Sequence, residues 1–216
     1  MTRQPSARTR HTRTPPAGSL LHGQLLATTL DTPDGPFTVV EDTDGVVHAC
    51  GWETDPAHVL ARTRPTSTVP VRHSDLRSST RGPGGPGAFH LSAAVRAVLA
   101  AYEGDATALG TVPVHLEGTD FQREVWQALR TIPAGSTRTY AELAVLAGRP
   151  RAVRAAAAAC GRNAIALFVP CHRVVAGNGA LAGFAWGVEV KRALLEREGT
   201  RAPRQERDMT TEASSV

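Results

Sequence analysis

The stretch Phe168-Val169-Pro170-Cys171-His172-Arg173-Val174 places a cysteine next to a histidine at the end of an apolar run. The run predicts a strand-like entry, and the proline stiffens the backbone just before the thiol. A free thiol has a pKa of about 8.5, so a basic and partly exposed setting is needed to raise its thiolate fraction at neutral pH. His172 and Arg173 supply such a setting. The pattern indicates a nucleophilic cysteine, although a buried cysteine that serves as a small hydrophobic residue is the alternative.

Length and composition are those of a globular protein. The 216 residues allow one large or two small domains, and 41% hydrophobic residues are enough for a core. The sequence has no run near the ~20 apolar residues of a membrane span and lacks the apolar segment of a secretory signal, so we expect a cytoplasmic protein without a membrane partner. Its cysteines, Cys50, Cys160 and Cys171, are odd in number and lack CxxC spacing, which argues against a disulfide framework or a clustered zinc site.

The net charge of +4 is unevenly distributed. Residues 1–18 hold four arginines and no acid, and they are too poor in apolar residues to fold alone, so we expect a disordered basic arm. Between residues 138 and 163 five arginines stand against one glutamate, Glu142; they are Arg138, Arg149, Arg151, Arg154 and Arg162. Such a patch can neutralise phosphates, and a solvated helix face is the alternative.

The part of the chain from residue 19 to 117 predicts a small structural α/β domain. Its β-prone runs lie at residues 25–26, 37–40 and 46–50, and turn signals separate them at Pro33-Asp34-Gly35 and Asp44-Gly45. Asp-Gly between β-prone runs is a hairpin marker, so a small antiparallel sheet is expected.

Two further segments complete this domain. Residues 63–87 are rich in Ser, Thr, Pro and Gly and predict a long mobile loop. Apolar residues at helical spacing from Leu91 to Tyr102 predict one helix that covers the sheet. Because Cys50 is the only cysteine of the domain, we expect no metal site there.

Residues 118–199 predict a mostly helical second domain. Thr119-Asp120-Phe121-Gln122 fits a capping box, and apolar residues at helical spacing follow it. Shorter helices are predicted from Thr139 to Leu146 and from Arg151 to Cys160, and the tight turn between them makes a helix-turn-helix candidate. The fold class is therefore α+β: a small N-terminal antiparallel sheet with a covering helix, followed by this helical domain. Residues 200–216 are expected to be a disordered tail.

Further residues form one sequence pattern together with the Pro-Cys-His-Arg-Val run. They are Asn163, Gly177, Gly179 to Leu181, Gly183-Phe184 and the closing Leu194-Leu195-Glu196-Arg197-Glu198. Over residues 19–199 the pattern resembles the O6-alkylguanine-DNA alkyltransferases, in particular the alkyltransferase half of Ada, and it is highly specific. The resemblance implies a suicide repair protein that transfers an alkyl group from O6-methylguanine in double-stranded DNA, with O4-methylthymine as a second candidate lesion. It implies no cofactor and no metal, and a monomer whose cooperativity on DNA is left open.

The resemblance also implies roles for the catalytic residues. Cys171 is the expected nucleophile, His172 the base that acts through a water, and Glu198 the carboxylate that orients the histidine ring. Tyr140 would contact the flipped guanine and protonate it as it leaves. Asn163 would brace the active-site strand.

The remaining expected contacts belong to the base pocket and to DNA. The expected substrate-binding residues are Pro170, Val174, Phe184, Ala185 and Trp186, of which Val174 and Ala185 would act through backbone groups. Trp186 would narrow the pocket mouth in favour of methyl. The expected DNA contacts are Thr139, Tyr140, Arg151, Arg154, Ala155, Arg162 and Arg173.

The predicted helix that carries Arg154 is unusual because it contains five consecutive alanines. It therefore has strong helix propensity and hardly any side-chain bulk. By the resemblance, this helix enters the minor groove and Arg154 fills the space of the flipped base. An alanine-rich helix packed in the core is the alternative.

Two other functional classes compete with alkyl transfer. A non-catalytic sensor of alkylation damage, or a regulator, would bind DNA through the helix-turn-helix and transfer nothing, but intact Cys171, His172 and Glu198 argue against it. A thiol hydrolase or redox enzyme would use a Cys-His pair. The helix-turn-helix beside the thiol, and the lack of a second cysteine close to it in sequence, disfavour that class.

Overall fold

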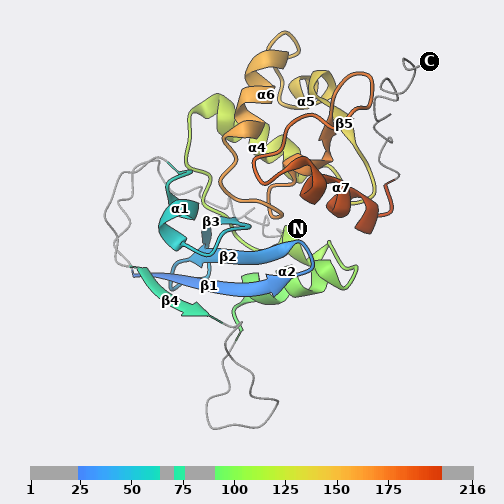
Figure 1. Ribbon diagram of the computed structural model, residues 1–216. Coiled ribbons are helices and arrows are strands. Elements are labelled where there is room, and N and C mark those ends of the chain that lie inside the picture. Colours follow the sequence, from blue (N-terminus) through green and yellow to red (C-terminus); the bar gives the residue numbers. More distant parts are fainter. Residues whose placement is uncertain (1–23, 64–70, 76–90, 201–216) are drawn as a thin grey trace, which may run out of the picture.

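The computed structural model describes residues 24–63, 71–75 and 91–200, and Figure 1 shows a sheet with its helices beside a helical part. The predicted arm, all of the predicted tail except Thr200, and most of the predicted loop lie outside the described residues. We call residues 24–117 the N-terminal part and residues 118–200 the C-terminal part. The predicted α+β class is confirmed. The division into two domains stays a prediction.

The N-terminal sheet has four strands in the order β3-β2-β1-β4. The strands β1 (Leu25–Thr32), β2 (Gly35–Glu41) and β3 (Val47–Gly51) form the predicted antiparallel sheet. Both turns fall at the predicted places, where Gly35 and Gly45 have φ of 112° and 77°. A side chain would be strained in that conformation, so glycine favours these turns.

The fourth strand, β4 (Val71–Asp75), pairs with β1 in parallel. It lies in the stretch for which the sequence predicted a loop, and that prediction is wrong at these five residues. Val71 is the only large apolar residue of the segment, so the segment lacks the alternating pattern by which a strand is found in sequence. The strand forms because the edge of β1 offers unpaired backbone groups.

Helices cover both faces of the sheet. On one face, α1 (Pro56–Leu60) contributes Val59 to a small cluster with Leu25, Ala27, Val40 and Ala49. On the other face, α2 (Ala93–Tyr102) is the predicted covering helix, and a short helix, α3 (Ala108–Thr111), follows it. The cluster on this second face joins residues of the sheet and α2 to residues of the C-terminal part, among them Phe37, Val39, Val95, Val98, Trp126, Leu129 and Phe168. One apolar core therefore spans both parts.

The C-terminal part contains α4 (Asp120–Arg130), α5 (Tyr140–Leu146), α6 (Val153–Gly161) and α7 (Val188–Arg197), together with a two-stranded parallel sheet of β5 (Arg138–Thr139) and β6 (Val174–Val175). The capping box predicted at Thr119 is confirmed: its hydroxyl accepts from the Gln122 N–H, and its own N–H donates to the Gln122 side chain. The pair α5 and α6, predicted as a helix-turn-helix, pack on each other. Within the described residues, no helix has the length and apolar character to cross a bilayer.

The free edge of β3 connects the sheet to the active-site segment. Residues 113–115 pair with the first half of β3. At its other end, the Cys50 N–H donates to the Ala164 carbonyl (2.9 Å), and the Ala166 N–H donates to the Cys50 carbonyl (3.3 Å). The chain continues from Ala166 to Cys171, so the sheet fixes the start of the segment that carries the thiol.

Candidate active site

The Cys171 thiol stands at the start of a short 3-10 helix, η2 (Cys171–Arg173). The apolar run before it is buried, but it consists of turns, and Leu167 has a φ of 67°. The predicted strand-like entry is therefore wrong. The run reads as a strand because it is apolar, whereas its backbone turns because side-chain groups take hydrogen bonds that a neighbouring strand would otherwise take.

Asn163 supplies those groups, in the place where the sequence predicted a brace. Its Oδ1 accepts from the Ile165 N–H (3.0 Å), and its Nδ2 donates to the Val169 carbonyl (2.7 Å). The same Nδ2 lies 3.1 Å from Cys171 Sγ. Asn163 is buried, so it both closes the turn and directs an amide donor at the sulfur.

Burial raises the pKa of the Cys171 thiol above its ordinary value, although the Asn163 hydrogen bond and the charges of Lys191 and Arg62 lower it in part. The sequence predicted the opposite, a setting that raises the thiolate fraction. Burial outweighs the neighbouring donors and charges, because a thiolate loses its hydration when it is enclosed. The thiol is therefore protonated at neutral pH, and a base must take its proton before the sulfur can attack.

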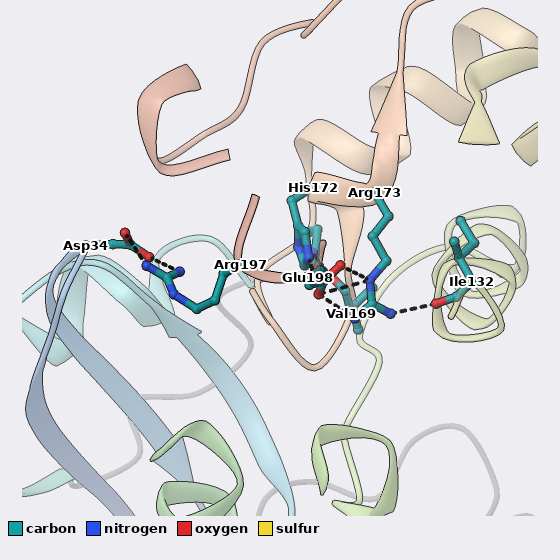
Figure 2. A network of polar contacts seen from close by, with 8 residues as sticks. Asp34, Ile132, Val169, His172, Arg173, Arg197 and Glu198 are labelled. Carbon is teal, nitrogen blue, oxygen red and sulfur yellow. Dashed lines mark hydrogen bonds and ion pairs between the residues drawn. The ribbon is translucent and has the colours of Figure 1, made fainter. Parts of the chain in front are cut away.

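A buried ion-pair network joins Glu198 to His172 and Arg173, the two residues that follow Cys171 (Figure 2). His172 Nε2 is 3.0 Å from Glu198 Oε1. The same carboxylate accepts from Arg173 through Nε (2.9 Å to Oε2) and Nη2 (2.6 Å to Oε1). Arg173 Nη1 donates to the Ile132 carbonyl (2.6 Å), which ties the network to the end of α4. Burial alone would raise the pKa of Glu198, but the hydrogen bonds and charges of His172 and Arg173 lower it to about 2.

The charge on Glu198 determines which nitrogen of His172 carries the proton. Because a carboxylate only accepts, Nε2 is the protonated nitrogen and Nδ1 is the acceptor. Nδ1 is buried and has no hydrogen-bond partner among the described residues. Burial lowers the pKa of His172, against Glu198, which raises it. The ring is thus neutral at pH 7 and has an unpaired proton acceptor, in the residue next to Cys171 in the sequence.

Tyr140 begins α5 and is half-buried. Burial, with the nearby Cys160 and Cys171 side chains, raises its pKa to about 12, so its hydroxyl keeps its proton and can donate. On the other side of the site, Val174 is buried in β6, and its carbonyl accepts from Lys191 Nζ (2.6 Å). Val174 is also paired with Arg138 in the two-stranded sheet, so this carbonyl lies where β6 and α7 meet.

The predicted substrate residues Phe184 and Trp186 lie in the loop before α7 and pack against the N-terminal part. Their rings are 6.0 Å and 6.2 Å from Trp52, measured between centroids. Trp186 crosses Gly51 so closely that a Cβ there would be 2.0 Å from the indole. The Arg62 guanidinium lies 4.8 Å from the Trp186 ring centroid. The ring of Trp186 therefore packs against the N-terminal part of the molecule. Of the remaining predicted substrate residues, Pro170 is buried and Ala185 is exposed.

The predicted DNA contacts separate into two groups. Arg151, Arg154, Ala155 and Arg162 are exposed on α6 or at its ends, and Thr139, whose hydroxyl caps α5, stands half-buried with Tyr140. Arg173 differs, because it is only 6% exposed and is paired with Glu198. The prediction that Arg173 binds DNA is therefore wrong, since its charge is used inside the protein.

The alanine run of α6 divides between the two alternatives. Ala156 and Ala159 are buried against the core, whereas Ala155 and Ala158 are exposed. The Trp126 indole donates to the Ala159 carbonyl (2.9 Å), which fastens α6 to α4. One face of the helix is therefore packed, and the other is bare and flanked by arginines.

Comparison with known proteins identifies the family of this chain. Residues 120–200 match the family model of the 6-O-methylguanine DNA methyltransferase DNA-binding domain. A methylated-DNA-protein-cysteine methyltransferase of Salmonella typhimurium is 41% identical over 177 residues, which cover 82% of this chain and 96% of that protein. The chain belongs to the methylated-DNA-protein-cysteine methyltransferase family.

Two further relatives of this methyltransferase extend the comparison. The bifunctional transcriptional activator/DNA repair enzyme Ada of Escherichia coli is 53% identical over 104 residues, which cover 48% of this chain but only 29% of that longer protein. The crystal structure of Mycobacterium tuberculosis OGT in complex with DNA superposes with a TM-score of 0.61 at 36% identity, over 82% of this chain and 95% of that one.

Sequence reasoning missed several residues of this methyltransferase's site. Lys191 is 1% exposed and donates to the carbonyls of Val174 and Ala182 (2.6 Å and 3.2 Å), so it holds together two stretches that contain or adjoin predicted substrate residues. A signal was present, because Lys191 stands three residues before Leu194 on the buried face of α7. Arg62 donates to the Gly161 and Asn163 carbonyls (3.2 Å and 3.3 Å), and it has no such signal.

Proposed function

We propose that this methyltransferase is a suicide DNA repair protein that moves the methyl group of O6-methylguanine, in double-stranded DNA, onto Sγ of its own Cys171. The observation that carries the proposal is a neutral, buried His172 with an unpaired Nδ1, which directly follows the protonated Cys171 in the sequence. O4-methylthymine is a second candidate lesion, because it too carries its alkyl group on an exocyclic oxygen. The protein acts as a cytoplasmic monomer and without a cofactor.

Activation begins with the thiol proton. His172 takes it at Nδ1 through a water, while Nε2 keeps its own proton toward Glu198. The imidazolium that forms is stabilised by the ionised carboxylate, as in other nucleophile-base-acid arrangements. The Asn163 amide, 3.1 Å from Sγ, stabilises the thiolate.

The transfer is a displacement at the methyl carbon. A bond forms between Sγ and carbon, and the bond between carbon and O6 breaks with its electron pair moving to the guanine. The Tyr140 hydroxyl, whose raised pKa keeps it protonated, donates a proton to the leaving base. The proton held by His172 then passes to the deprotonated Tyr140, directly or through solvent. Both side chains are neutral again after this step. The thioether product has no leaving group, so each protein molecule repairs one lesion.

Access to O6 requires the nucleotide to leave the stack. Flipping costs a few kcal/mol, which contacts to the extruded base and to the remaining duplex must offset. The bare, arginine-flanked face of α6 supports insertion into the minor groove, with Arg154 filling the space of the flipped base. Lys191 and Asn163 hold the pocket segments between which the base would enter.

The first test measures the intact mass of the protein after incubation with duplex DNA that contains O6-methylguanine. One methyl increment, located on Cys171 by peptide mapping and saturating at one per molecule, is the expected result. An unmodified protein that still shifts the methylated DNA on a gel would overturn the proposal and favour a damage sensor.

Arg154→Ala is expected to slow methyl transfer from duplex DNA by about tenfold or more, because the flipped state loses its filling side chain. Transfer from the free base O6-methylguanine should not change, since no flipping is needed. Single-turnover rates on both substrates give the comparison. Arg96→Ala, which removes an exposed arginine of α2 outside the basic patch, is the matched control. An equal loss on both substrates would contradict the role of Arg154.

A further inference from the structure

Arg197, the residue immediately before Glu198, is held by the N-terminal part. Its Nη1 is 3.0 Å from Asp34 Oδ2 and its Nη2 is 3.3 Å from Asp34 Oδ1. Figure 2 shows this pair beside the Glu198 network. The Asp34 side chain is 6% exposed and that of Arg197 is 24% exposed, so the pair is mostly shielded from water. Such a pair is more sensitive to loss of one partner than an exposed surface pair is.

Two aromatic residues complete this contact. The Tyr102 ring lies 4.7 Å from the Arg197 guanidinium, and its hydroxyl donates to Asp34 Oδ2 (2.9 Å). The Trp52 indole donates to the Tyr102 hydroxyl (3.2 Å). The turn after β1, the end of β3 and the end of α2 therefore meet at one side chain of α7. We call Asp34, Trp52 and Tyr102 the Arg197 clamp.

The clamp acts on the C-terminal end of α7. Backbone bonds close this last turn, because the Glu198 N–H donates to the Leu194 carbonyl (3.0 Å) and the Thr200 N–H donates to the Leu195 carbonyl (2.8 Å). The turn therefore moves as one unit, and the Arg197 contact attaches that unit to the N-terminal part. Glu198 caps α7 and is followed by Gly199, with φ of 79°. A cavity of about 20 Å³ adjoins Tyr102, Arg197 and Glu198, which leaves room for movement there. Holding Arg197 consequently holds the backbone of Glu198.

We propose that Asp34 and Tyr102 are positioning residues for alkyl transfer, which hold Arg197 and thereby keep the Glu198 carboxylate on His172. This inference rests on the proposed function of the site. It gives the N-terminal part, for which the sequence predicted a structural role only, a direct influence on the chemistry.

The test is Asp34→Asn, which keeps the size of the side chain and an acceptor for Tyr102 but removes the charge. The expected single-turnover rate of methyl transfer is about tenfold lower, because small displacements of a catalytic group are costly. Affinity for methylated duplex DNA should be unchanged. The pH midpoint for alkylation of Cys171 by iodoacetamide should rise, since a displaced Glu198 stabilises imidazolium less well.

The pH midpoint separates positioning from a general structural effect. The charged groups that shift the pKa of His172 are Glu198, Arg173 and Lys191, and those that shift the pKa of Cys171 are Lys191 and Arg62. Asp34 belongs to neither set. A change of midpoint in Asp34→Asn must therefore act through Arg197 and Glu198.

The matched control is Asp42→Asn. Asp42 is an acid of the other turn of the sheet and pairs with His48 (2.9 Å), away from α7. The Asp42→Asn variant should lose thermal stability, whereas its methyl-transfer rate and its pH midpoint for alkylation by iodoacetamide should be unchanged. The double variant of Asp34→Asn with Arg197→Gln should be no slower than the slower single variant, because both changes break one contact.

One result would overturn the inference: an Asp34→Asn protein that, like Asp42→Asn, loses thermal stability but keeps the wild-type rate and midpoint. The iodoacetamide midpoint reports on Cys171 and His172 without any DNA. If the wild-type protein failed to accept a methyl group, the proposed function would fall, whereas the clamp would still be tested by this midpoint.

Discussion

Cys171→Ala is expected to abolish methyl transfer and to leave binding of O6-methylguanine DNA intact. The rate should fall by more than about a thousandfold, because His172 and Tyr140 can move protons but neither replaces the sulfur that forms the new bond. The alanine side chain fits the same space, so the fold and the DNA-binding face of α6 should persist. Intact mass after incubation, together with a gel-shift titration, measures both quantities on one sample.

Cys160→Ala is the matched control for this experiment. Cys160 is buried in α6, and burial raises its pKa well above the ordinary value, so it should not react. This variant should accept one methyl group at close to the wild-type rate. Transfer by Cys171→Ala at a comparable rate would instead place the nucleophile at another residue and contradict the proposed site.

Glu198→Gln is expected to have the second largest effect, because one carboxylate serves both His172 and Arg173. The amide cannot stabilise the imidazolium as a charge does, so methyl transfer should slow by about a hundredfold or more. Arg173, which is 6% exposed, loses its counter-charge inside the protein. Breaking a buried pair in this way costs about 3 to 5 kcal/mol of the free energy of unfolding.

The contribution of Glu198 to the stability of the fold should depend on pH in a defined direction. The pKa of Glu198 is lowered from 4.5 to about 2 in the folded protein. Its carboxylate therefore stabilises the fold above about pH 4.5, and this contribution, about 3 kcal/mol, is lost as the pH falls toward 2. Denaturant unfolding at several pH values measures this contribution. Between pH 5 and pH 2 the free energy of unfolding should fall more steeply for the wild type than for Glu198→Gln. Protonation of His172 in the unfolded chain also lowers the stability of both proteins as the pH falls below about 6.5.

Glu196→Gln provides the control, because Glu196 is an exposed residue of the same helix. It should transfer methyl normally and keep the wild-type pH dependence. If Glu198→Gln unfolds too readily to be assayed, Glu198→Asp keeps the charge and isolates geometry: stability should be largely restored and the rate only partly. A Glu198→Gln protein with the wild-type rate would show that His172 needs no carboxylate.

The local features of this protein follow from short patterns. The capping box at Thr119 is a contact between residues three positions apart, so four letters contain both partners. The turns at Gly35 and Gly45 depend on conformations that glycine adopts without strain. Where a feature lacks such a pattern, as in the strand β4, it was missed, because its partner strand lies about forty residues earlier in the chain and the segment itself is polar.

The errors at the site have a common physical cause. Arg173 follows His172 in sequence and looks like a contact for phosphate, but folding buries it against Glu198. The thiol of Cys171 stands in a basic sequence, yet burial raises its pKa. Sequence shows which charges are near along the chain, whereas the cost of removing a group from water depends on what the fold places around it.

The sequence alone determined the family and the α+β class, and it predicted the cysteine, histidine and glutamate of the site, because these follow from residue types at characteristic spacings. Only the tertiary structure decided that Glu198 is shared between His172 and Arg173, that Lys191 holds together two stretches that contain or adjoin predicted substrate residues, and that Asp34 reaches Arg197 across the two parts of the molecule. Partners 25 and 163 residues apart leave no periodic trace in the sequence. Their contacts arise when the sheet edge, the core and the helices are packed together, and burial then gives each charge its effect.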